Sequence, residues 1–160
     1  RQMCIRDSLR KERGMSMILI THDLGVVKGR TDEIMVMYGG RVMEKAPAET
    51  LFKRMMHPYT EALLSSIPRL NDPKHTRLTP IEGFPPDIVD GPQGCKFAAR
   101  CKYAQDICVT SPPEETTDGP HKYSCYFPVG TDAGTQALKS NQAQGFTAAG
   151  LRIKSKSEVI

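Results

Sequence analysis

The stretch MILITHDLGVV, Met17–Val27, decides the expected fold. Met17–Ile20 is a continuous apolar run that is too short to span a membrane and too β-branched to favour a helix. Such a run is typical of a central strand covered on both faces, as in a parallel α/β sheet. Thr21, His22 and Asp23 end the run, where open α/β sheets usually bind ligands. His22 is therefore a candidate functional residue, and the alternative is that Thr21 or Asp23 caps the next segment while His22 is merely exposed.

The composition falls in the ordinary range for globular chains. The 160 residues are 39% hydrophobic and 25% charged, and the net charge is +4. The basic residues are scattered, so the charge pattern does not predict nucleic-acid binding. No apolar stretch reaches membrane-spanning length, and the chain does not open with a signal peptide. In a cytosolic protein, the five cysteines favour metal or redox use over disulfides.

The first residues predict a domain that starts upstream of this chain. Residues 1–8 have no periodicity and resemble translated sequencing-adapter sequence, so Cys4 is given no role. Residues 9–14 are typical of the end of a helix, with Gly14 as its stop. A helix directly before a buried parallel strand is the second half of a βαβ unit. We therefore expect the chain to begin in the middle of a domain.

A hairpin and two short helices are expected after the His22 turn. Gly39-Gly40 lies between two apolar-rich runs, which predicts a β-hairpin because both turn positions need positive φ. A helix is expected to start at Pro47 and to end or restart at Pro58, and Pro68 ends the next one. The predicted elements are the hairpin 33–44 and the helices 47–56 and 59–66.

Two further segments are expected to lie outside packed elements. Residues 68–94 are rich in proline and predict an extended linker lying on a surface. Residues 130–160 are polar, rich in small side chains and almost free of aromatics, which predicts a disordered or poorly packed tail.

Four cysteines form the second informative pattern. Cys95, Cys101, Cys108 and Cys125 have five, six and sixteen residues between successive members. Structural zinc sites usually supply cysteines in closer pairs, whereas a cubane iron–sulfur cluster is larger and accepts wider spacing. The spacing leaves three alternatives open: an iron–sulfur cluster, a zinc site, or thiols that are unrelated or paired in two disulfides.

Basic residues lie among these cysteines. We expect them to offset the negative charge of a four-thiolate site and to lower the pKa values of the thiols. Residues 92–128 also contain few large apolar side chains, so metal binding is expected to supply much of the folding free energy there. The basic residues are Lys96, Arg100, Lys102, His121 and Lys122.

Several motifs together resemble one family. Residues 18–27 resemble the switch-histidine loop of ABC transporter ATPases, and residues 36–44 resemble the hairpin that follows it. The pattern HPYT…LL.S.P in residues 57–68 is similar to the signature of oligopeptide/dipeptide importer ATPase subunits. Residues 83–86, GFPP, and the cysteine pattern of residues 94–125 resemble the C-terminal extension of those subunits. The resemblance covers about residues 9–127.

The resemblance implies a fold class and domain boundaries. The fold would be α/β, the C-terminal fragment of a P-loop NTPase (ABC ATPase) domain, followed by a small, loop-rich, cysteine-containing C-terminal extension. Residues 9–68 would belong to the ATPase domain, residues 69–129 to the extension and residues 130–160 to the tail, with residues 1–8 a non-native leader.

The same resemblance implies residue roles. His22 would contact the γ-phosphate of ATP bound with Mg²⁺ and order the attacking water, and Asp23 would shape the loop. The histidine and tyrosine of the signature, His57 and Tyr59, would be structural and hold the two helices together. The ligands of a [4Fe–4S] cluster, with zinc as the alternative metal, would be Cys95, Cys101, Cys108 and Cys125.

The implied function is the ATP-hydrolysing subunit of an ABC importer for dipeptides or oligopeptides. Its partners would be a second ATPase subunit, identical or paralogous, the transmembrane permease and, indirectly, a peptide-binding protein, with no nucleic acid. It would lie peripherally on the cytoplasmic face of a bacterial or archaeal membrane. The phosphate loop, the metal-binding Asp with its catalytic Glu, and the signature loop would lie upstream of Leu9, so we expect the fragment itself to be inactive. The alternative is a stand-alone iron–sulfur or zinc binding module.

Overall fold

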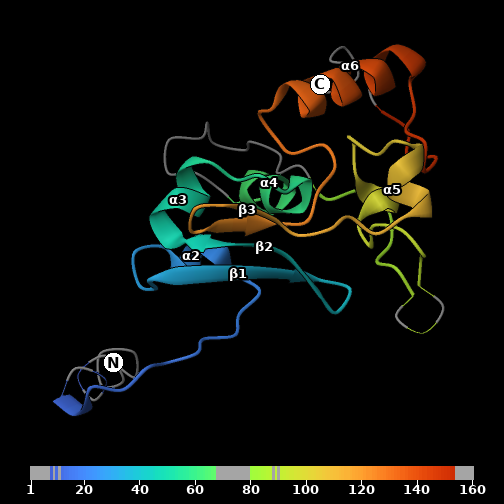
Figure 1. Ribbon diagram of the computed structural model, residues 1–160. Coiled ribbons are helices and arrows are strands. Elements are labelled where there is room, and N and C mark those ends of the chain that lie inside the picture. Colours follow the sequence, from blue (N-terminus) through green and yellow to red (C-terminus); the bar gives the residue numbers. More distant parts are fainter. Residues whose placement is uncertain are drawn as a thin grey trace, which may run out of the picture.

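The computed structural model describes residues 8, 10, 12–67, 80–87, 89 and 91–153. Its strands are Glu33–Tyr38 (β1), Arg41–Pro47 (β2), Thr116–Asp118 (β3) and His121–Tyr123 (β4). Its helices are Leu24–Val27 (α2), Ala48–Lys53 (α3), Pro58–Ser65 (α4), Asp106–Thr110 (α5) and Asp132–Gln144 (α6), with a 3₁₀ helix at Ala98–Arg100 (η1). Figure 1 shows α3 and α4 together on one side of the sheet, with α5 beyond one end.

The predicted hairpin is confirmed. β1 and β2 pair antiparallel, and Gly39 and Gly40 make the turn with φ values of 55° and 77°. Both values lie in the left-handed region that favours glycine. Ile34, Val36 and Tyr38 of β1 are buried, and the residues between them are exposed, because successive side chains of a strand point to opposite faces.

The sheet of the described residues is entirely antiparallel. Its strand order is β1-β2-β4-β3, in which β4 pairs with β2 through Glu44 opposite Tyr123 and Lys45 opposite Lys122. The sheet therefore joins the first half of the chain to the segment that contains the cysteines. The predicted boundary between residues 68 and 69 stays a prediction, although hydrogen bonds of one sheet cross it.

The predicted buried parallel strand at Met17–Ile20 is wrong for this structure. The segment has no regular secondary structure, and Ile18 and Ile20 are each 92% exposed. Figure 1 shows the chain before α2 extending away from the sheet. An apolar run forms a central strand only where neighbouring strands take up its N–H and C=O groups and helices cover both faces. The described residues supply neither, because the four strands of the sheet pair with one another.

The two helices after the hairpin are confirmed, with one change. α4 is close to the predicted helix, but α3 ends at Lys53 instead of reaching Met56. The helix stops because the backbone N–H groups of Met56 and His57 donate to the carboxylate of Glu44, not to helical carbonyls. The helical turn predicted before Gly14 is also present, since Gly14 has φ +61° and Met15 N donates to Arg10 O.

The expectation of a disordered or poorly packed tail is wrong for residues 130–153. Asp132–Gln144 form α6, whose N-cap Thr131 accepts a hydrogen bond from Gly134 N and whose C-cap Gly145 has φ +80°. The helix is polar over most of its surface, which hides it from a search for amphipathic patterns. Residues 154–160 lie outside the described part of the chain.

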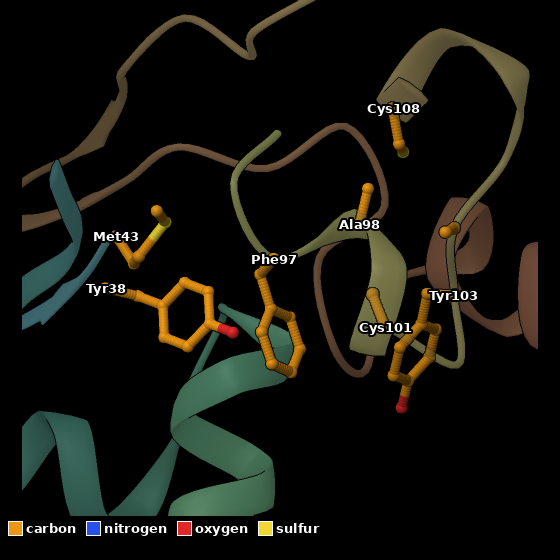
Figure 2. Packing of buried hydrophobic residues seen from close by; sticks show 8 residues of the cluster. Tyr38, Met43, Phe97, Ala98, Cys101, Tyr103 and Cys108 are labelled. Atoms are coloured by element: carbon orange, nitrogen blue, oxygen red, sulfur yellow. The ribbon is translucent and has the colours of Figure 1, made fainter. Parts of the chain in front are cut away.

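The buried residues form two clusters. One lies under the hairpin and α3, around Ile34, Val36 and Leu51. The other joins the sheet to the cysteine segment, and Figure 2 shows the rings of Tyr38 and Phe97 between Met43 on one side and Ala98 and Cys101 on the other. Among the described residues, no helix is long and apolar enough to cross a membrane.

Candidate functional site

Two tight turns set the positions of Cys95 and Cys101. Ala98 N donates to Cys95 O at 3.0 Å, and Cys101 N donates to Ala98 O at 3.1 Å, so η1 spans the interval between the two cysteines. Cys95 N also donates to Cys108 O at 2.8 Å, which brings the irregular segment before η1 against α5. Gly94 is required at this approach, because a Cβ there would overlap the carbonyl oxygens of Cys108 and Val109.

The other two cysteines come from neighbouring elements. Cys108 lies on α5, where its backbone N–H donates to Gln105 O at 2.8 Å. Cys125 lies two residues after the end of β4, and the residue between them, Ser124, donates its N–H to Met43 O on β2 at 3.0 Å. The sheet therefore positions the last cysteine relative to the other three.

α6 braces the loop between Cys101 and Cys108. Asn141 is 2% exposed, and its Nδ2 donates to Lys102 O at 2.9 Å and to Ala104 O at 3.1 Å. Its Oδ1 accepts from Gln105 Nε2 at 2.8 Å. One buried amide thus satisfies several polar groups of the loop, and this brace was missed because sequence patterns do not reveal a polar contact across 36 residues.

All four cysteines line one small cavity. Its volume is about 10 Å³, close to the space that the centre of a single water molecule takes up. The other described side chains of its wall are mostly apolar. They are His57, Pro58, Ala98, Tyr103, Pro113, Tyr126 and Phe127. Figure 2 shows Cys101 beside Tyr103 and Cys108 on the far side of Ala98. The structure therefore brings together the four cysteines that the sequence singled out.

The four sulfurs are free thiols, so the alternative of two disulfides is not what the structure contains. In the described ranges, no group of three or more His, Cys, Asp or Glu side chains is placed to hold a metal ion. A single zinc ion needs its ligands to converge on one point at about 2.3 Å. The thiols surround a common space without converging in that way.

Burial raises the pKa of every thiol in the group. Desolvation is the largest cause for each, and it raises the pKa of Cys125 to about 12 and that of Cys101 well above its usual range. Neighbouring thiols add to the rise, since a second thiolate beside Cys101 would be repelled by the charge of Cys125. Without a metal these are neutral, unreactive thiols rather than nucleophiles.

The expectation that basic neighbours lower these pKa values is wrong. Lys96 Nζ donates to Pro92 O, Lys102 Nζ pairs with Glu61 at 3.1 Å, and Lys122 pairs with Glu115 at 3.2 Å. The guanidinium of Arg100 donates to the carbonyls of Ile81 and Glu82, which holds the segment before Gly83 on the surface. Each basic group is thus directed to another partner, and the described wall of the cavity contains no lysine or arginine.

A buried carboxylate beside the cavity was missed by the sequence analysis. Glu44 is fully buried; its Oε1 accepts from Met56 N at 2.5 Å and its Oε2 from His57 N at 3.1 Å. His121, 2% exposed, places Nε2 2.7 Å from Glu44 Oε1. The one available signal was a charged residue after the apolar pair Val42-Met43 in a strand, which is ambiguous because strands often alternate polar and apolar residues.

His57 occupies two environments at once. As the N-cap of α4, its Nδ1 accepts from Tyr59 N at 3.0 Å, while its ring packs against Phe97 and forms part of the cavity wall. Burial lowers the pKa of His57 to about 4. Tyr59 packs between Tyr38 and Phe97. These contacts agree with the expectation that both residues are structural.

His22 lies apart from the cysteines, in an exposed bend before α2. Asp23 is the N-cap of α2, and its Oδ1 accepts from Gly25 N at 2.7 Å, while Thr21 Oγ1 accepts from Asp23 N at 3.1 Å. The local geometry is therefore that of the alternative in which Asp23 caps the next helix while His22 is exposed. The catalytic role of His22 stays a prediction.

Comparison with known proteins gives a family match that covers most of the strand β2 and three of the four cysteines. Residues 43–108, which run from the buried β2 strand to the third cysteine, match the family model described as oligopeptide/dipeptide transporter, C-terminal region. This part of the chain is therefore similar to that C-terminal region.

Relatives of the oligopeptide/dipeptide transporter family match beyond that region. The oligopeptide transport ATP-binding protein OppD of Salmonella typhimurium is 41% identical over 127 residues, which are 79% of this chain and 38% of OppD. The dipeptide transport ATP-binding protein DppD of Bacillus subtilis is 42% identical over 120 residues, 74% of this chain and 36% of DppD. OppD of Mycobacterium tuberculosis is 38% identical over 145 residues, 90% of this chain and 22% of that protein. The chain thus spans well under half the length of these relatives.

Proposed function

We propose that this chain is part of the ATP-hydrolysing subunit of an ABC importer for dipeptides or oligopeptides. The observation that carries the proposal is the similarity to the OppD and DppD proteins, which covers 74% or more of the chain and whose names state ATP binding and peptide transport. This similarity does not favour the alternative of a stand-alone metal-binding module.

His22 is the residue of this chain that acts on the nucleotide in the proposed function. Its exposed position before the capped α2 helix leaves the imidazole open to a ligand. A histidine there would hold the γ-phosphate of Mg²⁺-ATP and orient the attacking water, since catalysis of phosphoryl transfer rests mainly on positioning and charge stabilisation.

In the full-length subunit, His22→Ala tests this role. We expect ATP hydrolysis to fall by roughly 100-fold, the scale of losing one positioned charge-stabilising donor, while nucleotide affinity stays close to that of the unaltered protein. Turnover and nucleotide binding should be measured on the same preparation, because a loss of both would indicate misfolding. Near-normal turnover would show that His22 is only an exposed neighbour of the Asp23 cap.

The second part of the proposal is that Cys95, Cys101, Cys108 and Cys125 hold a [4Fe–4S] cluster. The donor set fits this group, because four free thiols line one cavity with mainly apolar walls. The intervals of five, six and sixteen residues between the cysteines are wider than the close pairs of most structural zinc sites, which favours a larger group with several metal corners. When bound, the cluster would supply a four-point covalent cross-link and one-electron redox chemistry.

The chain's own residues determine how such a group is held. Gly94 lets Cys95 approach α5, Asn141 fixes the loop between Cys101 and Cys108, and the sheet places Cys125. Binding deprotonates thiols whose pKa burial has raised, so cluster uptake releases protons and becomes more favourable as pH rises.

Partners follow from the same similarity. We propose that the full-length subunit works with a second ATPase subunit, identical or paralogous, beneath a transmembrane permease served by a peptide-binding protein. It would lie peripherally at the cytoplasmic face of the membrane. Co-purification of the subunit with its permease from detergent-solubilised membranes, and its loss when the permease is deleted, is the result that we expect.

A further inference from the structure

The proton of the His57 ring is assigned by its cap contact. Nδ1 accepts the backbone N–H of Tyr59 at 3.0 Å, so this nitrogen carries the lone pair. A neutral imidazole with Nδ1 as acceptor carries its proton on Nε2. The lowered pKa of His57 agrees with a neutral ring at physiological pH.

The Nε2–H group of His57 is a buried donor. His57 is 1% exposed, and Nε2 has no hydrogen-bond partner among the described residues. A buried donor without an acceptor costs about 1–3 kcal/mol, so its presence needs a physical explanation. Because Nδ1 is directed at the backbone of α4, the opposite ring edge, with Nε2, is directed away from that helix.

The cavity that His57 lines is the place where an acceptor for the Nε2–H group could lie. Two other polar side chains of the wall are already engaged, since Tyr103 Oη donates to Glu61 and Tyr126 Oη donates to Pro112 O. His121 Nδ1 is also an unpartnered buried nitrogen, but His121 is not part of the described wall. The remaining polar side-chain atoms of the described wall are the four thiol sulfurs, and none of them accepts from Nε2 in this structure.

We propose that His57 Nε2–H donates a hydrogen bond to a sulfur of the group that the four cysteines hold. This inference rests on the proposed iron–sulfur site and makes His57 a positioning residue for it. Sulfide and thiolate sulfurs become better acceptors as they gain electron density, so the hydrogen bond is stronger in the reduced state. A donor at this place therefore raises the reduction potential and slows loss of the group.

Two substitutions of His57 separate this role from helix capping. His57→Asn keeps an acceptor at about the position of Nδ1, and asparagine is a strong N-cap residue, but the donor at the Nε2 position is lost. His57→Gln reaches the Nε2 position with an N–H donor and gives up the short cap. If His57 only caps the helix, Asn should be the better replacement. If His57 donates the proposed hydrogen bond, Gln should retain the cluster better than Asn.

The full chain and both variants should be reconstituted anaerobically with iron and sulfide. Three quantities are then compared: the half-time of cluster loss to a chelator, the midpoint potential from a spectroelectrochemical titration, and the urea midpoint of the metal-free protein. We expect His57→Asn to lose its cluster about 10- to 100-fold faster and to have a lower potential. His57→Gln should match the unaltered chain in both cluster measurements, even where its metal-free form is less stable.

The opposite order of the two variants would overturn the inference, as would equal behaviour of both variants in the cluster measurements. These outcomes leave the proposed metal site intact, because the group is still bound. An unaltered chain that takes up no iron and sulfide would overturn the proposed site and this inference with it.

Discussion

Replacing Glu44 with alanine is expected to destabilise the fold severely. The carboxylate is fully buried and accepts from two backbone N–H groups, those of Met56 and His57, and it pairs with His121. Glu44→Ala would leave all three groups buried without an acceptor. Each such group that is left without its acceptor costs about 1–3 kcal/mol, so the loss of all three contacts costs at least about 3 kcal/mol. We therefore expect a loss of about 3–5 kcal/mol in the free energy of unfolding.

Urea unfolding of the metal-free chain measures this loss. With a typical slope of about 2 kcal/mol per M, the midpoint should fall by about 2 M. Glu49→Ala is the matched control, because Glu49 is an exposed glutamate paired with Lys53 at 3.4 Å and should contribute at most about 0.5 kcal/mol. Equal, small shifts for the two variants would refute the reasoning that Glu44 joins β2, the start of α4 and β4.

Three further predictions concern the surroundings of the cavity. Asn141→Ala should lower the free energy of unfolding by about 1–3 kcal/mol, because the carbonyls of Lys102 and Ala104 lose their donor. A urea midpoint that equals that of the native chain would contradict this. The four thiols of the metal-free folded chain should react with iodoacetamide much more slowly at pH 7.5 than after unfolding, since burial raises their pKa values. Fast labelling of the native chain, measured by mass spectrometry, would contradict this. The folded pKa of His57, about 4, lies below its ordinary 6.5, so the unfolded chain binds more protons and stability falls as pH drops from about 6.5 to about 4. The loss from His57 is at most about 3 kcal/mol, and His57→Gln should lack this part of the pH dependence.

Local signals in the sequence were enough for the elements that depend on backbone conformation. Gly39-Gly40 specifies a turn with positive φ, and Pro58 starts a helix whose first N–H needs no partner, so the hairpin and α4 are both found where they were predicted. The four cysteines also come together as their grouping in the sequence indicated.

Features that depend on contacts between distant segments could not be predicted from local sequence patterns. Met17–Ile20 has the pattern of a buried strand, but burial needs neighbours that the described residues do not provide, and the segment is exposed. Glu44 is buried because its partners come from α4 and β4, and Asn141 because it fills the polar gap in a loop 36 to 39 residues away. The pKa values of the thiols rise because the fold buries them, while the basic residues near them in the sequence pair with other groups in space.

The most direct test of the proposed metal site is the content of iron, acid-labile sulfide and zinc in the chain purified without oxygen. We expect iron and sulfide in equal amounts, about four of each per chain, and their joint loss when Cys101 is changed to Ser. Cys101 is the test position because it is buried among the other three thiols. One zinc per chain without sulfide, or a metal-free chain with unchanged stability, would contradict the account.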